Sequence, residues 1–363
     1  MNSSEKFKFF IFILYSLVFL IITTNYLSLN DLIFVANQND ITSYIPIAEK
    51  SPLLPRNNEI IIQHVAQRFF IPYIVGLFSK ILNLDIFITY KIFTFLFILF
   101  LIYIIFFIAK EFNFNIYESI LFFSLFFFNP YLIRHHLFNP VQAHDLIFYL
   151  LCFTFSFGII KNNNKFKYIS SLSSILIRQT GIAMIIGFIV DCIFKKKISS
   201  INFILFLLIF FIISFTTSKI GHYISIKEFY FKYAYGIIEY DFSKISELTR
   251  FLFLPLVSFF PLLIFLLCKV KMNIDKTIIV TLLITSLLMI GQPIAAGPDG
   301  SGRNIVRIAS LCYPILITLL FYTFELKKIY KNKILFILFI VGLHFWSLHP
   351  TFSKIKFFSI IRF

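Results

Sequence analysis

Long apolar runs separated by short polar segments set the pattern of this chain. Clear examples are Phe9 to Ile22, Ile92 to Ala109, Ile201 to Phe215 and Ile334 to Leu343. Their lengths approach the ~20 apolar residues that an α-helix needs to cross a bilayer, where each backbone amide must be satisfied within the segment. The pattern predicts an all-α, polytopic transmembrane helix bundle that forms one integral membrane domain, residues 1–363.

The apolar runs predict about eleven spans. They cover residues 8–29, 86–109, 116–133, 145–160, 166–177, 182–194, 200–217, 250–268, 276–291, 305–325 and 334–348. The segment 166–194 holds either two short helices that meet near Arg178 or one long helix that inverts everything after it. The positions of the later lysine-rich loops favour two helices.

Short lysine-rich loops indicate which ends of the spans face the cytoplasm. They are Lys161 to Lys167, Lys195 to Lys197, Lys269 to Lys276 and Lys327 to Lys333. This orientation places the N-terminus inside and two long loops outside, an external loop 1 at about residues 30–85 and a second at about 219–249. An odd number of spans then puts the C-terminus outside.

External loop 1 contains an apolar segment too short to span a membrane. Arg68, Pro72, Gly76 and Lys80 recur every four positions within Arg68 to Leu82. This spacing places them on one face of a helix, and the length is typical of a helix lying along the membrane surface. We therefore expect an interfacial helix here.

Composition and charge agree with a membrane protein. The chain is 59% hydrophobic and only 14% charged, whereas soluble domains carry about one-quarter charged residues. Its net charge of +16 comes from lysines clustered between apolar runs, which excludes the continuous basic face of a nucleic-acid-binding protein. The predicted topology puts all eight arginines on or near the outer face: Arg56, Arg68, Arg134, Arg178, Arg250, Arg303, Arg307 and Arg362.

Arginine on one face of the membrane favours the recognition of an anion. A guanidinium grips phosphate or carboxylate through two parallel hydrogen bonds, whereas lysine suffices as a topology anchor. Arg178 interrupts an apolar stretch, which indicates a polar cavity, because a charge at membrane depth is costly. Arg303 and Arg307 follow a glycine-rich turn at 297–302, and their spacing places them on one helical face. Chance is the alternative explanation.

Three further groups of polar residues could carry chemistry. Asp40, with Tyr44, lies just after the first span and could accept a proton from a hydroxyl, although a helix N-cap is an equal alternative. His64, Gln67 and Arg68 could hold a lipid phosphate or simply anchor headgroups. The third group comprises Arg134, His135, His136, His144 and Asp145.

The third group raises the question of a metal. His135 and His136 are adjacent, and the sequence has no His-x-x-x-His pair that would present two ligands on one helical face. We therefore predict no metal site and no certain cofactor, with a divalent metal as the alternative.

These motifs together resemble the GT-C superfamily of polytopic glycosyltransferases, which use polyprenyl-phosphate-linked sugars. The resemblance rests on Asp40, Tyr44 and Ala48 in the first external loop, Arg68 with Pro72, and Asp145 at the start of a span. It extends to Arg-Gln-Thr-Gly from Arg178 and to Arg307 with Pro314. It covers most of the chain, which lacks the paired acidic motif and soluble C-terminal domain of better-known members.

The resemblance implies inverting transfer of a hexosyl or pentosyl group to a lipid-linked or glycan acceptor. Asp40 would be the base, and Arg178, Arg303, Arg307 and Arg68 would bind the donor phosphate. The substrate pocket would include Tyr44, His64, Gln67, Arg134, His135, His144 and Asp145. We expect the chain in a bacterial inner membrane, among membrane lipids, with its site on the periplasmic face, serving cell-envelope synthesis.

Two other classes of membrane protein compete with this interpretation. A transporter or lipid flippase would show charges through the full membrane depth and internal symmetry between its halves, and no repeat is visible in the sequence. A polysaccharide polymerase or ligase would share the large outer loop and its arginines. The sequence alone separates such a polymerase or ligase poorly from the glycosyltransferase.

Overall fold

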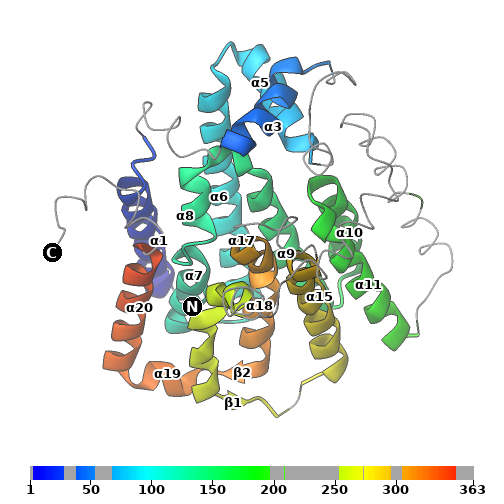
Figure 1. The fold of residues 1–363 in the computed structure, drawn as a ribbon. Helices are drawn as coiled ribbons and strands as arrows, with labels where there is room; N and C mark the ends of the chain where they lie inside the picture. The colour runs from blue at the N-terminus through cyan, green and yellow to red at the C-terminus, as the bar shows by residue number, and fades with distance from the viewer. Residues whose placement is uncertain are drawn as a thin grey trace, which may run out of the picture.

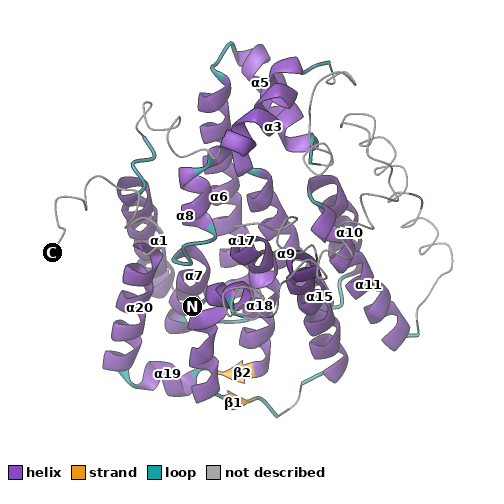
Figure 2. Cartoon of the chain, in the orientation of Figure 1, coloured by secondary structure: helices purple, strands orange, loops and turns teal. Residues whose placement is uncertain are grey.

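The chain is mostly helical (Figures 1 and 2). The computed structural model describes residues 3–27, 38–53, 68–196, 208, 253–272, 274–295 and 305–348, with the backbone alone for 38–43. The helices up to residue 194 are α1 (Ser3–Thr23), α3 (Gln38–Lys50), α5 (Phe70–Leu82), α6 (Ile86–Glu111), α7 (Ile116–Phe127), α8 (Ile133–Phe138), η1 (Pro140–Gln142), α9 (His144–Ile160), α10 (Asn164–Ile177), η2 (Gln179–Gly181) and α11 (Ile182–Phe194). The later elements are η4 (Leu254–Leu267), β1 (Lys269–Val270), α15 (Lys276–Ala295), α17 (Ile305–Ala309), η6 (Ser310–Cys312), α18 (Tyr313–Thr323), β2 (Phe324–Glu325), α19 (Lys327–Lys331) and α20 (Lys333–Leu348).

Several helices have the length and composition of membrane spans. Among the described residues, the segments that are long and apolar enough to cross a membrane are Ser3–Thr23, Ile86–Glu111, Pro140–Ile160, Lys276–Ala295 and Ile305–Thr323. Shorter apolar helices accompany them, including α5, α7 and α20. These helices indicate an integral membrane protein, while the count of eleven spans stays a prediction. The span expected at 200–217 lies, except for residue 208, outside the described residues.

Some predicted boundaries were wrong for local reasons. The first span, expected at 8–29, is α1, which ends at Thr23. The hydroxyl groups of Thr23 and Thr24 donate to carbonyls one turn earlier, and Asn25 then adopts a left-handed conformation with φ 50°. Within the span expected at 250–268, Leu254–Leu267 forms a 3-10 helix that contains Pro255 and Pro261, and proline has no backbone N–H to donate to an α-helix.

Residues 166–194 form two helices, as the sequence predicts. The helix α10 ends at Ile177, and Arg178 then takes an extended conformation with φ −159° and ψ 142° before η2 leads into α11. Gly181 is required in this turn, because a Cβ there would lie 2.5 Å from the backbone carbon of Ser174. The break at Arg178 is therefore built into the backbone.

The lysine-rich segments gather at one end of the bundle. Figure 1 shows α19, β1 and β2 at the end away from α3 and α5. At that end Lys161 Nζ donates to the carbonyl of Glu111 at 2.8 Å, and Lys271 Nζ donates to the carbonyl of Phe321 at 2.8 Å. We call this the lysine end, and the end that carries α3 and α5 the opposite end.

The predicted helix of external loop 1 is present as α5, and it packs closely on α3. A Cβ at Gly76 would lie 1.9 Å from the carbonyl oxygen of Ala48, so the two backbones touch where glycine removes the side chain. Asn83 ends α5 with φ 51°, a left-handed conformation that asparagine tolerates well. The position of α5 along a membrane surface stays a prediction.

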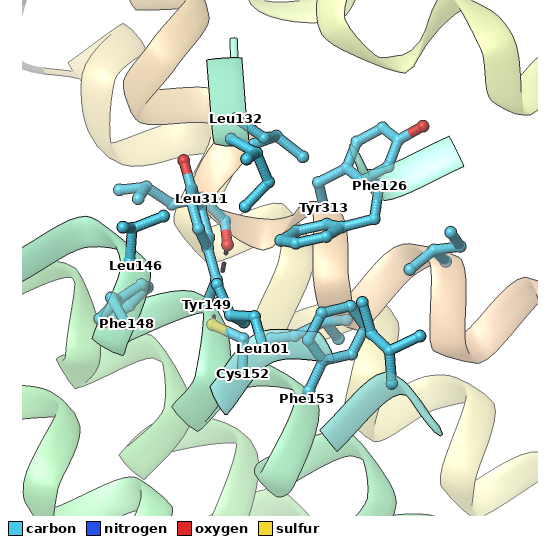
Figure 3. Close-up of a cluster of buried hydrophobic side chains, with 14 of the residues drawn as sticks. Leu101, Phe126, Leu132, Leu146, Phe148, Tyr149, Cys152, Phe153, Leu311 and Tyr313 are labelled. Atoms are coloured by element: carbon cyan, nitrogen blue, oxygen red, sulfur yellow. Dashed lines mark hydrogen bonds between the residues drawn. The ribbon is translucent and has the colours of Figure 1, made fainter. Parts of the chain in front are cut away.

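The helix α9 lies at the centre of the bundle and is buried nearly all round. Figure 3 shows Tyr149, Cys152 and Phe153 of α9 among side chains from α6, α7, η6 and α18. The rings of Phe126 and Phe153 are 5.0 Å apart, in the edge-to-face arrangement that aromatic pairs prefer. Apolar packing therefore fixes α9 and, with it, the polar residues at its N-terminal end.

Candidate functional site

Three interruptions of helices meet near the opposite end of the bundle. They are the segment from α8 through η1 into α9, the turn between α10 and α11, and the start of α17 (Figure 1). The hydroxyl of Thr94 donates to the carbonyl of Pro140 at 3.2 Å. Thr94 is eight residues after Ile86, the first residue of α6. The carbonyl of Pro140 therefore contacts α6 at ~12 Å along its axis from the N-terminal end of that helix.

Asp145 is the carboxylate of the site. It lies in the first turn of α9, where the helix dipole favours a negative charge. Arg178 donates to its Oδ1 through the guanidinium Nη1, and His144 Nε2 lies 3.1 Å from the same oxygen. All three side chains are at most 1% exposed. A buried charge of this kind is stable only with an opposite charge beside it.

Arg68 joins external loop 1 to this group. Its Nε donates to Gln179 Oε1 at 3.1 Å, and its Nη1 donates to the hydroxyl of Tyr44 at 3.0 Å. The ring of Tyr44 packs against that of His144, with their centroids 4.9 Å apart. Arg68, just before α5, thus connects residues of α3, α9 and η2 that are far apart in the sequence.

Arg307 approaches from α17 on the other side. Its Nη1 donates to Gln142 Oε1 and lies 3.4 Å from His135 Nε2. His135 Nε2 is also 2.8 Å from Gln142 Oε1. We call Tyr44, Arg68, His135, Gln142, His144, Asp145, Arg178, Gln179 and Arg307 the arginine cluster.

Positive charge exceeds negative charge around Asp145. The cluster contains the guanidinium groups of Arg68, Arg178 and Arg307, whereas Asp145 is the one acidic side chain that the described residues contribute to it. Several buried guanidinium nitrogens have no hydrogen-bond partner among the described residues. They are Arg178 Nε and Nη2 and Arg307 Nε. Buried polar groups of this kind are costly. The arrangement therefore offers N–H donors and a surplus positive charge to an anion.

The structure brings together most, but not all, of the predicted site residues. Arg134 takes no part in the contacts above. It lies in α8 and donates to the hydroxyl and carbonyl oxygens of Thr23, the last residue of α1, at 3.0 Å each. His64, Gln67, Arg303 and the side chain of Asp40 lie outside the described residues. The backbone of Asp40 belongs to the first turn of α3, so the N-cap interpretation was wrong.

Gln142 is a site residue that the sequence pattern did not predict, and Gln179 has a role here that its motif did not indicate. Both amides accept a hydrogen bond from an arginine, and Gln142 is 2% exposed. A neutral polar side chain beside an interruption of an apolar run was the available signal, because such a group needs a partner inside the bundle.

The described residues contain no group of three or more histidine, cysteine, aspartate or glutamate side chains that could hold a metal ion. The chain matches no protein-family model, no curated protein and no solved structure.

Proposed function

We propose that this chain is a glycosyltransferase that moves a sugar from a polyprenyl-phosphate donor to a lipid-linked or glycan acceptor. The observation that carries the proposal is that Arg178, bonded to Asp145, and Arg307, bonded to Gln142, meet at the N-terminal end of α9, with guanidinium N–H groups that have no partner among the described residues. A lipid phosphate supplies the negative charge and the acceptor oxygens that these groups lack, and arginine binds such oxygens in a planar, two-point geometry.

The position of the arginine cluster supports a substrate that arrives from the membrane. The cluster lies inside an apolar helical bundle and close to α3 and α5, away from the lysine end. A polyprenyl chain can remain among the lipid tails while its phosphate enters the bundle. With eleven spans and a GT-C-like fold, the cluster faces the outside of a bacterial inner membrane.

The reaction needs stabilisation of the departing phosphate and a base for the acceptor. As the glycosidic bond breaks, negative charge grows on the lipid phosphate, and Arg178 and Arg307 stabilise it in a buried site that requires little rearrangement. Asp40 takes the proton of the attacking acceptor hydroxyl, and attack on the anomeric carbon inverts its configuration. Asp40 is one helical turn before Tyr44, whose hydroxyl group contacts Arg68.

The proposal can be tested with purified protein in proteoliposomes. Radiolabelled polyprenyl-phosphate sugars are supplied with membrane-lipid acceptors, and transfer and donor binding are measured separately. We expect Asp40→Asn to abolish transfer but retain donor binding, and Arg307→Gln to weaken donor binding. Arg134→Gln is the matched control, because it also removes a buried arginine. Full transfer by Asp40→Asn would remove Asp40 from the mechanism, and equal donor binding by both arginine variants would argue against the phosphate site.

A further inference from the structure

His136 is a buried side chain to which the proposed function gives no role. It lies in α8 and is 0% exposed. Neither of its ring nitrogens has a hydrogen-bond partner among the described residues. A neutral imidazole carries one N–H donor and one acceptor nitrogen, and no described residue satisfies either of them.

The ring of His136 lies next to the arginine cluster. Its centroid is 5.7 Å from that of Tyr149 and 5.2 Å from that of His135. Tyr149 is four residues after Asp145 in α9, so the two side chains share one face of that helix. His135 in turn lies 3.4 Å from Arg307 Nη1. The ring of His136 thus packs against Tyr149 and against His135, which belongs to the arginine cluster.

The titratable groups around His136 come from three helices. They are His135 from its own helix, His144, Asp145 and Tyr149 from α9, and Arg307 from α17. Burial holds the pKa of His136 well below its usual value, His135 and Arg307 lower it further, and Asp145 opposes them. Burial and the neighbouring cation therefore favour the neutral ring in the free protein.

We propose that His136 is a further phosphate-binding residue of this site and that it takes up a proton when a phosphate group binds. The assignment rests on the proposed function, because the phosphate is that of the lipid donor. An anion held by Arg178 and Arg307 brings negative charge close to the ring, and a nearby opposite charge favours the protonated form. The proton comes from water, and the new N–H donates to a phosphate oxygen.

Protonation of His136 on phosphate binding would help the transfer step by stabilising the departing lipid phosphate. The donor is a phosphodiester with one negative charge, and the lipid phosphate that leaves carries a second. The imidazolium of His136 offers a charge-assisted hydrogen bond to that oxygen, the stronger class of hydrogen bond in proteins. In the free protein the neutral ring avoids a third buried positive charge beside Arg178 and Arg307.

Proton uptake on binding can be measured without any sugar transfer. Farnesyl phosphate, as the probe, is titrated calorimetrically into the full chain in detergent at pH 7, in two buffers with different ionisation enthalpies. We expect the wild type to take up about one proton more than His136→Gln, by linkage of protonation to binding. The affinity of the variant should fall about tenfold, as for loss of one hydrogen bond to a charged group. The probe's own ionisation contributes equally when both proteins bind the same charge form of the probe.

Two variants and one control separate the outcomes. His136→Phe, which keeps a ring in the same space, should match His136→Gln in its proton uptake. His344→Gln, in α20 and outside the arginine cluster, should behave as the wild type. Equal proton uptake by the wild type and both His136 variants would overturn the role of His136 alone. Absence of probe binding to the wild type, or binding that survives Arg178→Gln, would overturn the proposed function itself.

Discussion

Two groups of buried charges occupy opposite ends of the same pair of helices. The arginine cluster includes the turn between α10 and α11. At the lysine end, Lys167 Nζ and Lys195 Nζ each lie 2.6 Å from a different oxygen of Asp191, and we call these three residues the lysine cluster. Both lysines also donate to Asn162 Oδ1, at 2.9 and 3.1 Å.

The two clusters differ in how completely their charges are paired. In the lysine cluster each ammonium group lies against an oxygen of Asp191 and donates to Asn162, so both cations have an anionic partner within the protein. In the arginine cluster, guanidinium nitrogens of Arg178 and Arg307 lack partners among the described residues. Closed networks hold elements in place, whereas open ones of this kind offer hydrogen bonds to a ligand. We therefore assign stability to the lysine cluster and binding to the arginine cluster.

Removing Arg178 should give the largest functional difference between the clusters. We expect Arg178→Gln to slow sugar transfer by about 10³-fold, because it removes a donor that stabilises the departing phosphate. Lys167→Gln, the matched change in the lysine cluster, should leave the transfer rate per folded molecule near that of the wild type. Transfer assays in proteoliposomes compare them, and equal losses would erase the functional distinction.

Removing Asp191 should act on stability instead. We expect Asp191→Ala to lower the free energy of unfolding by about 3 kcal/mol, because it leaves the buried ammonium of Lys167 without its carboxylate. Denaturant unfolding in detergent measures the change. Affinity for farnesyl phosphate should stay unchanged. A large loss of affinity at unchanged stability would reverse the roles assigned to the two clusters.

Separating α3 from α5 should disturb the arginine cluster alone. Gly76→Ala places a methyl group against the carbonyl of Ala48, and overpacking of this kind costs about 2 kcal/mol. The shift should move Tyr44 relative to Arg68 and weaken probe binding. Gly291→Ala is the control, since nothing lies within 4 Å of its added Cβ. Calorimetric titration of both variants decides, and equal affinities would disconnect this packing from the site.

The smallest effect is expected at Tyr44. Tyr44→Phe removes the hydroxyl that accepts a hydrogen bond from Arg68, and keeps the ring that packs on His144. A loss of about 1 kcal/mol in probe affinity would fit one hydrogen bond. Unchanged affinity would mean that Arg68 is positioned by Gln179 without Tyr44.

The sequence was most informative where polar residues interrupt apolar runs. Arg178 stands inside such a run, and the cost of a charge at membrane depth predicts a polar environment within the bundle, where this arginine is buried. The lysine-rich loops that follow predict the break between α10 and α11. The four-residue spacing of Arg68, Pro72, Gly76 and Lys80 likewise predicts the helix α5. These predictions use only local patterns and the physics of the bilayer.

Local patterns do not predict which side chains distant in the sequence contact each other. Arg307 and Gln142 are 165 residues apart, and nothing in either neighbourhood indicates the other. The lysine-rich loop predicts that Lys167 is a topology signal, whereas in the structure its ammonium group is buried against Asp191. The same lysine can anchor a loop in water or close a buried ion pair. Only the packing of α10 on α11 decides between these environments.

The turn between α10 and α11 also constrains the length of the chain there. Arg178 and Gln179 are consecutive, yet they bond to different partners. Arg178 donates a hydrogen bond to Asp145, and Gln179 accepts one from Arg68. One inserted or deleted residue between Ile177 and Gly181 would change which way each side chain points. Homologues that keep this chemistry must therefore keep this spacing, and an engineer who wants to add a reporter should choose another loop.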